Sequence, residues 1–224
     1  MELFTRILLA IHIAAGFISI VIFWVPILTK KGNKLHRLAG KLYVYAMWAV
    51  TISAMLLSVK NVLIENYDSA LFLGFLSLIT AGPLWYGIAI LKHRNGPSLR
   101  LKKIQLVLNF MILGMAVFMI LYNTIMLSGT HILMYIFGGL GLTALPEITR
   151  YFKGKSNGRN HIQEHAIGMV TTAIAAYTAF FAFGGRAFFG EIFTGNLMII
   201  PWVLPGVLGT IANFYYGRKY AFKG

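Results

Sequence analysis

The chain contains seven apolar stretches, each long enough for a helix to cross a lipid bilayer. A membrane-spanning helix needs about 20 apolar residues, because the hydrocarbon core offers no partner for unpaired backbone groups. The predicted spans cover residues 4–28, 36–59, 70–91, 104–127, 131–149, 162–184 and 196–216. No connection between them is long enough for another domain. Residues 1–224 are therefore predicted to form a single polytopic transmembrane domain.

The composition excludes a water-soluble globule and several kinds of site. Hydrophobic residues make up 58% of the chain and charged residues only 12%, whereas soluble domains carry about 25% charged residues. The chain has no cysteine. Disulfides, thiolate metal sites, iron–sulfur clusters and cysteine nucleophiles are therefore excluded.

The basic residues predict how the helices are oriented. The net charge is +14, which in a soluble protein would suggest nucleic acid. Here 17 of the 20 basic residues lie in alternate connections and at the C-terminal end, where anionic lipid headgroups, and not nucleic acid, are the expected partner. The positive-inside rule places these segments in the cytoplasm and the N-terminus outside. We expect an all-α bundle of seven transmembrane helices in the bacterial cytoplasmic (inner) membrane, arranged as three helical hairpins followed by a seventh helix.

Polar residues within the predicted spans admit two interpretations. Amides inside a membrane commonly hydrogen-bond neighbouring helices, but together with His12 they could instead line a path for a small solute. The amides are Gln105, Asn109, Asn123 and Asn213. Glycines within the spans are interpreted as positions of close helix packing, because no strand precedes them as in a nucleotide-binding loop. These are Gly82, Gly87, Gly138, Gly139 and Gly141.

Three histidines are predicted to lie at the cytoplasmic boundary. His36 opens the second span, and His161 and His165 open the sixth. His161 and His165 are four residues apart and share a helical face, so a helix could present both imidazoles to one metal ion. With Glu164 at the same level, the candidate ligands for a divalent metal are His36, His161, His165 and Glu164. The alternative is that interfacial histidines bind lipid phosphates or reach water.

Histidines from two helices could also hold haem b. Bis-imidazole ligation of haem needs one histidine from each of two helices at the same depth. The candidate cofactor-binding pairs are His36 with His165 on the inner side and His12 with His131 on the outer side. The depths of His12 and His131 differ by roughly 10–15 Å at about 1.5 Å per residue. The inner pair therefore satisfies the requirement better.

Residues 161–165 also match a metalloprotease motif. The segment His161-Ile162-Gln163-Glu164-His165 has the H-x-x-E-H pattern of inverzincins, in which two histidines bind zinc and the glutamate is the general base. The match covers five residues and comes without the soluble catalytic domain of those enzymes. A metal-dependent hydrolase is therefore retained as one alternative.

Two stretches resemble a family of bacterial membrane proteins. Residues 36–43, His-Arg-Leu-Ala-Gly-Lys-Leu-Tyr, resemble the H-R-x-x-G-x-x-Y signature of an uncharacterised group of predicted multi-pass membrane proteins of unknown function. Residues 165–180, followed by Pro201-Trp202 and Pro205, are similar to the second half of that group. The resemblance implies the fold and the location but no reaction. The placement of the histidines also resembles that of multi-helix membrane cytochromes.

These observations leave four functional hypotheses. The first is a cytochrome b-like redox protein that holds haem b or a divalent metal near the cytoplasmic face and exchanges electrons with a protein or quinone partner. The others are a transporter or channel for a small solute, a metal-dependent hydrolase, and a structural or assembly factor without a site. Catalytic residues, enzymatic activity and oligomeric state are left open by the sequence.

Overall fold

The computed structural model describes residues 2–155, 158–184, 197 and 199–221, and these residues form helices joined by short turns. The first four long helices are α1 (Glu2–Leu28), α2 (Lys34–Leu63), α3 (Tyr67–Ala89), which continues into a 3-10 turn (Ile90–Lys92), and α4 (Leu99–Met126). The chain then forms α5 (Ile132–Gly141), α6 (Ala144–Phe152), α7 (His161–Ala179) with a π-helical turn (Phe180–Gly184), and α9 (Ile200–Lys219).

Six of these helices are long and apolar enough to cross a membrane: α1, α2, α3 with its 3-10 turn, α4, α5 with α6, and α7 with part of its π-helical turn. The described residues are therefore all-α, as expected, and the length and composition of the six helices are consistent with a multi-pass membrane protein. The predicted seventh span, 196–216, corresponds to α9, which is not among the six. α9 contains two prolines and Asn213, and it ends in Arg218 and Lys219. Residues 196 and 198 of that prediction lie outside the described residues.

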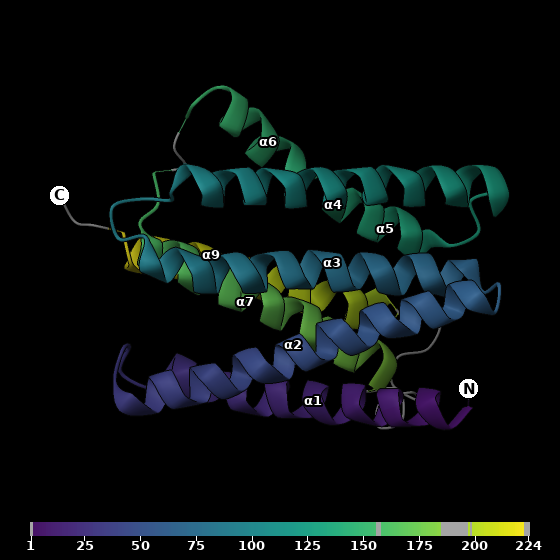
Figure 1. Ribbon diagram of the computed structural model, residues 1–224, viewed down its shortest axis with the longest axis horizontal. Coiled ribbons are helices and arrows are strands. Elements are labelled where there is room, and N and C mark those ends of the chain that lie inside the picture. The colour runs from purple at the N-terminus through teal and green to yellow at the C-terminus, as the bar shows by residue number, and fades with distance from the viewer. Residues whose placement is uncertain (1, 156–157, 185–196, 198, 222–224) are drawn as a thin grey trace.

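The helices form an antiparallel bundle in which α2 and α3 are central. Figure 1 shows the α1–α2 and α3–α4 connections at the end where the chain terminates, and the N-terminus with the α2–α3 and α4–α5 connections at the other end. The first of these ends carries most of the described basic residues and is called the lysine-rich end below. Within the bundle, 44% of the most apolar part of α2 and of α3 is buried, against 17% for α1 and α4. The apolar surfaces of α1 and α4 therefore face outward, as lipid contact requires.

The predicted fifth span is broken, and this changes the third predicted hairpin. The span 131–149 is divided into α5 and α6 at Leu142 and Thr143. Pro146 is the physical reason, because it has no amide hydrogen to donate to the carbonyl of Leu142. Both halves pack on α4, whereas α7 packs on α3, α9 and α1. The fifth and sixth spans therefore do not pack against each other as the predicted third hairpin requires.

Glycines allow the closest helix approaches, as predicted for three of the five positions named above. At the crossing of α3 and α7, a Cβ atom on Gly168 would lie 2.9 Å from the Pro83 carbonyl oxygen and 3.0 Å from Gly87 Cα. Gly138 and Gly141 of α5 approach α4 in the same way, through Ile120 and Ala116. In contrast, Gly82 makes only ordinary contact and Gly139 has open space beside it.

Alanine should have opposite effects on stability at two helical glycines, one at the crossing of α3 and α7 and one in open space on α4. Gly168→Ala should lower the free energy of unfolding by about 1–3 kcal/mol, because two backbones would have to separate. Gly114→Ala, in α4 with nothing within 4 Å, should raise it by up to about 1 kcal/mol, because alanine restricts the unfolded chain. Unfolding of the purified variants in mixed micelles measures both. Equal effects of the two substitutions would contradict the close crossing.

Candidate functional site

His36 is held by the end of the preceding helix. The N-cap residue of α2, Asn33, accepts a hydrogen bond from the His36 amide at 2.7 Å. The His36 ring donates from Nδ1 to the carbonyl oxygen of Pro26, 3.1 Å away. Lys31 Nζ donates to the same oxygen and to that of Ile27, at 2.5 and 2.7 Å. The last carbonyl groups of a helix have no partner within the helix. Lys31 and His36 supply those partners for α1.

His165 is held in the same way by α3. It lies in the second turn of α7, and its Nδ1 donates to the carbonyl oxygen of Gly87 at 2.7 Å. Gly87 is three residues from the point where α3 tightens into its 3-10 turn. Gly168, one turn along α7 from His165, provides the close approach to α3 described above. The glycine crossing thus brings His165 within reach of a backbone carbonyl.

His36 and His165 lie at the same depth in the bundle. The buried Tyr43 hydroxyl of α2 is 2.7 Å from the Thr172 hydroxyl of α7, and both helices begin at the lysine-rich end. His36 precedes Tyr43 by seven residues, and His165 precedes Thr172 by seven. At about 1.5 Å per residue, both histidines lie roughly 10 Å from this hydrogen bond toward the same end. They are also close enough for His36 to influence His165 electrostatically.

The carbonyl partners fix which nitrogen of each ring is available. A carbonyl oxygen only accepts, so Nδ1 of His36 and of His165 must carry the hydrogen. In the neutral ring, Nε2 then keeps its lone pair. This is the arrangement in which histidines commonly bind metals, with the second ring nitrogen donating to a carbonyl or carboxylate. Two oriented imidazoles at one depth are therefore the central feature of the candidate site.

The other predicted metal ligands are placed differently. The Nδ1 atom of His161 is buried without a hydrogen-bond partner among the described residues, and its ring is half-buried. Glu164 is buried, and its Oε1 lies 4.0 Å from Nη1 of Arg159. In the part of the chain that the structure describes, no three histidine, aspartate or glutamate side chains are grouped so that they could hold a metal ion.

The two predicted outer histidines have different neighbours. His12 lies beside α2, with Nδ1 2.9 Å from the Ser53 hydroxyl and 3.2 Å from the Val50 carbonyl oxygen. His131 is the N-cap residue of α5, and its Nε2 lies 3.8 Å from a carboxylate oxygen of Asp68, in the first turn of α3. The two side chains therefore contact separate parts of the bundle.

The amides within the spans serve separate contacts. Asn123 donates to the carbonyl of His131 and accepts from its amide, at 3.1 and 3.2 Å, and so fixes the α4–α5 turn. Asn213 of α9 donates to the Thr171 hydroxyl of α7 at 3.2 Å. Asn109 is buried. Oε1 of Gln105 is a buried atom that has no partner among the described residues. The bonds of Asn123 and Asn213 are the packing contacts that the first interpretation expects.

Comparison of the chain with protein-family models, with curated proteins and with solved structures finds no match in any of the three.

Sequence reasoning missed two features of the lysine-rich end. Asn160 and Gln163 form a capping box at the start of α7, and their amide groups also donate to the carbonyl oxygens of Tyr220 and Gly217 at the end of α9. The Asn-x-x-Gln spacing before an apolar run signals this box. The second feature is a groove between α1, α7 and α9. No local sequence pattern indicates it, because its walls come from three separate helices.

The ring contacts predict the tautomers of the histidines. In their neutral forms, His36 and His165 should both carry the hydrogen on Nδ1, because each Nδ1 donates to a carbonyl oxygen. His93, in the α3–α4 connection, should show a mixture of both tautomers. Nitrogen-15 chemical shifts of histidine-labelled protein in micelles distinguish these states. A hydrogen on Nε2 of His36 or His165 would contradict the oriented pair.

Proposed function

We propose that the protein is a membrane-embedded redox protein that binds haem b between His36 and His165. The observation that carries the proposal is the pair of rings at one depth, each with Nδ1 committed to a backbone carbonyl and Nε2 free to act as a ligand. Bound haem would supply one-electron transfer. Two neutral imidazole nitrogens are donors that fit haem iron, so His36 and His165 would hold the group.

The charges around the pair favour haem over a bare metal ion. Lys31 acts electrostatically on His165, and Lys34 and Arg37 flank His36 along the chain. Positive charge repels a divalent cation but attracts the two propionates of haem b. The described residues also offer no three-ligand metal group. A metal-dependent hydrolase at residues 161–165 receives less support for the same reasons.

Each residue of the proposed site has a separate task. Pro26 and Gly87 orient the rings through their carbonyl oxygens. Tyr43 and Thr172 tie α2 to α7 and so fix the spacing between the two histidines. Membership of the bacterial family whose signature the chain resembles agrees with this assignment, because His36 and Tyr43 are both signature positions. Membership of that family is itself a prediction.

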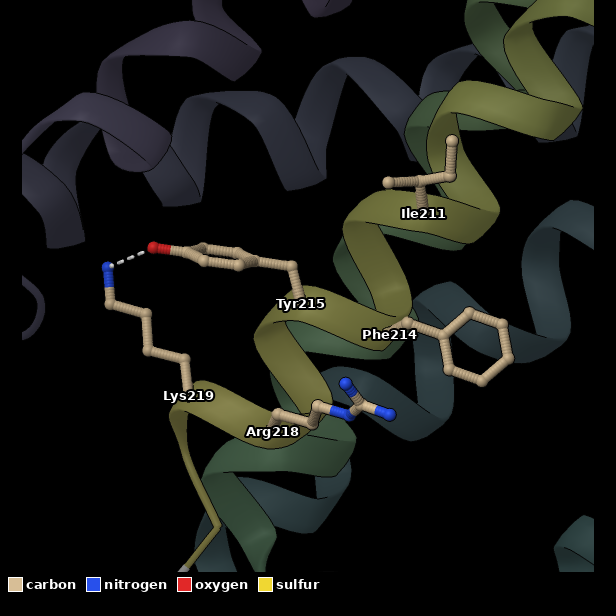
Figure 2. A pocket seen from close by; sticks show the side chains of 5 residues that line it. All are labelled: Ile211, Phe214, Tyr215, Arg218 and Lys219. Carbon is tan, nitrogen blue, oxygen red and sulfur yellow. Dashed lines mark hydrogen bonds between the residues drawn. The ribbon is translucent and has the colours of Figure 1, made fainter.

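We also propose that the lysine-rich end faces the cytoplasm, in agreement with the positive-inside rule. The described end of α9 has the composition of a membrane–water interface. Figure 2 shows a shallow depression on α9 lined by Ile211, Phe214, Tyr215, Arg218 and Lys219. Lys219 Nζ lies 3.4 Å from the Tyr215 hydroxyl and 5.3 Å from the centre of the Tyr215 ring. Aromatic and basic residues of this kind mark the headgroup level.

The proposed orientation predicts the location of both termini. A C-terminal reporter that is active only in the cytoplasm should be active, and an N-terminal tag should be accessible to protease from outside intact cells. The same tag placed in the α3–α4 connection, after Asn95, should be protected. A protected N-terminus together with an active C-terminal reporter would mean that an even number of helices crosses the membrane and that α9 lies outside it.

The haem proposal predicts a difference among four histidine variants. Asparagine can still donate to a carbonyl oxygen but has no nitrogen in place of Nε2. His36→Asn and His165→Asn should therefore insert and fold but lose the Soret absorption that the wild-type protein shows after expression with added haem precursor. His161→Asn and His93→Asn, the matched controls, should retain it.

An absorption spectrum of the purified proteins with haem extraction provides the measurement. Absence of haem from the wild-type protein, or equal retention by all four variants, would contradict the proposal. A loss of insertion in His165→Asn, with haem retained in His36→Asn, would show that His165 only stabilises the contact with Gly87.

A further inference from the structure

A groove of about 390 Å³ separates α1 from α9, with α7 as its floor. Its walls are almost entirely apolar and rich in aromatic side chains. The lining includes Phe23, Trp24 and Ile27 from α1, and Leu208, Ala212 and Tyr216 from α9. Trp24, Leu204 and Leu208 are about half exposed, at 51%, 48% and 57%. The groove therefore opens sideways, toward the space that lipid occupies around a membrane protein.

The length of the groove matches one leaflet of a bilayer. Along α9 the lining extends from Leu204 to Tyr216, which is roughly 18 Å at about 1.5 Å per residue. One leaflet contributes about 15 Å of hydrocarbon. Ile27 and Tyr216 form the end of the groove nearest the lysine-rich end of the bundle. A single hydrocarbon chain would thus extend from the headgroup level toward the middle of the membrane.

One lysine from each wall lies near that end. Lys31 donates to the carbonyl oxygen of Ile27, a lining residue of α1, and Lys219 follows the lining residue Tyr216 by one turn of α9. Desolvation, and then the nearby charge of Lys219, lower the pKa of Lys31. The two lysines therefore place positive charge on both walls at that end of the groove. Each ammonium has three hydrogens to donate, of which Lys31 uses two on carbonyl oxygens, and an anion at this end would be attracted to both charges.

We propose that this groove binds one anionic phospholipid of the surrounding membrane, with an acyl chain along α7 and its phosphate between Lys31 and Lys219. The shape selects a chain of one-leaflet length, and the two lysines select a negative headgroup. The lining of the groove is separate from the histidine pair, because neither His36 nor His165 belongs to it, whereas Lys31 lies near both sites.

Native mass spectrometry tests the proposal after the protein is released from vesicles of equimolar phosphatidylglycerol and phosphatidylcholine. The wild-type protein should retain about one phosphatidylglycerol. The double variant Lys31→Gln with Lys219→Gln should lose selectivity for phosphatidylglycerol by about tenfold, because each lysine close to the phosphate contributes to the binding of an anionic headgroup. Lys102→Gln with Lys103→Gln removes the same charge from α4, at the same end of the bundle, and should leave selectivity unchanged. Equal losses in the two double variants would overturn the proposal.

A second pair of variants tests the groove itself. Ala212→Trp fills the groove and should abolish retention, whereas Ile211→Trp, on the exposed face of α9 (Figure 2), should not. Unchanged retention in a folded Ala212→Trp protein would overturn the proposal.

If Ala212→Trp fails to fold, the fluorescence of the wild-type protein and of Trp24→Phe is compared in vesicles containing phosphatidylglycerol brominated in its acyl chains. Quenching should fall in Trp24→Phe and should exceed that given by brominated phosphatidylcholine. The same quenching by both lipids would contradict anionic selectivity. Haem absorption should stay unchanged in Ala212→Trp, Ile211→Trp and Trp24→Phe, so failure of the groove is separable from failure of the haem site.

Discussion

The membrane interior provides no hydrogen-bond partners, and the lysine-rich end of this protein is organised by that constraint. Helix ends leave carbonyl groups unpaired. Each unpaired backbone group buried in lipid lowers the stability of the fold by roughly several kcal/mol. Here side chains from the following or neighbouring helix satisfy them. Lys31 and His36 bind the end of α1, His165 binds α3 near its end, and Asn160 with Gln163 binds the end of α9. The same bonds determine where the two imidazoles point.

A histidine that binds a helix-end carbonyl can serve two purposes at once. The contact through Nδ1 stabilises the fold, and it leaves Nε2 as the only nitrogen that can bind another group. An asparagine in the same place would satisfy the carbonyl equally well but would provide no ligand. The structural contact alone therefore does not account for histidine at both positions. His12 also contacts a carbonyl oxygen through Nδ1, so the shared depth of His36 and His165 is what distinguishes this pair.

The sequence predicts the helices well because each apolar run is a local property. The six spanning helices begin and end close to the predicted limits, and the shared depth of His36 and His165 follows from the order of the spans. The break at Leu142 could have been anticipated from Pro146. The packing of α7 on α3 instead of α6 could not, because it depends on Gly87 and Gly168, which are 81 residues apart in the sequence. The carbonyl partner of His165 depends on the same crossing, whereas that of His36 lies at the end of α1.

Helix α7 connects the two proposed sites through different faces. His165, Gly168 and Thr172 recur at intervals of three or four residues and face α3 and α2. Ala173 and Tyr177 line the groove on the side of α1 and α9. Close contact with α3 requires small residues on the first face only, so the second face is free to carry the groove. A substitution at Gly168 therefore acts directly on the contact of His165 with Gly87, whereas one at Ala212 acts on the groove alone. The two sites share α7 and Lys31, but the carbonyl contacts of the histidines and the lining of the groove involve different residues.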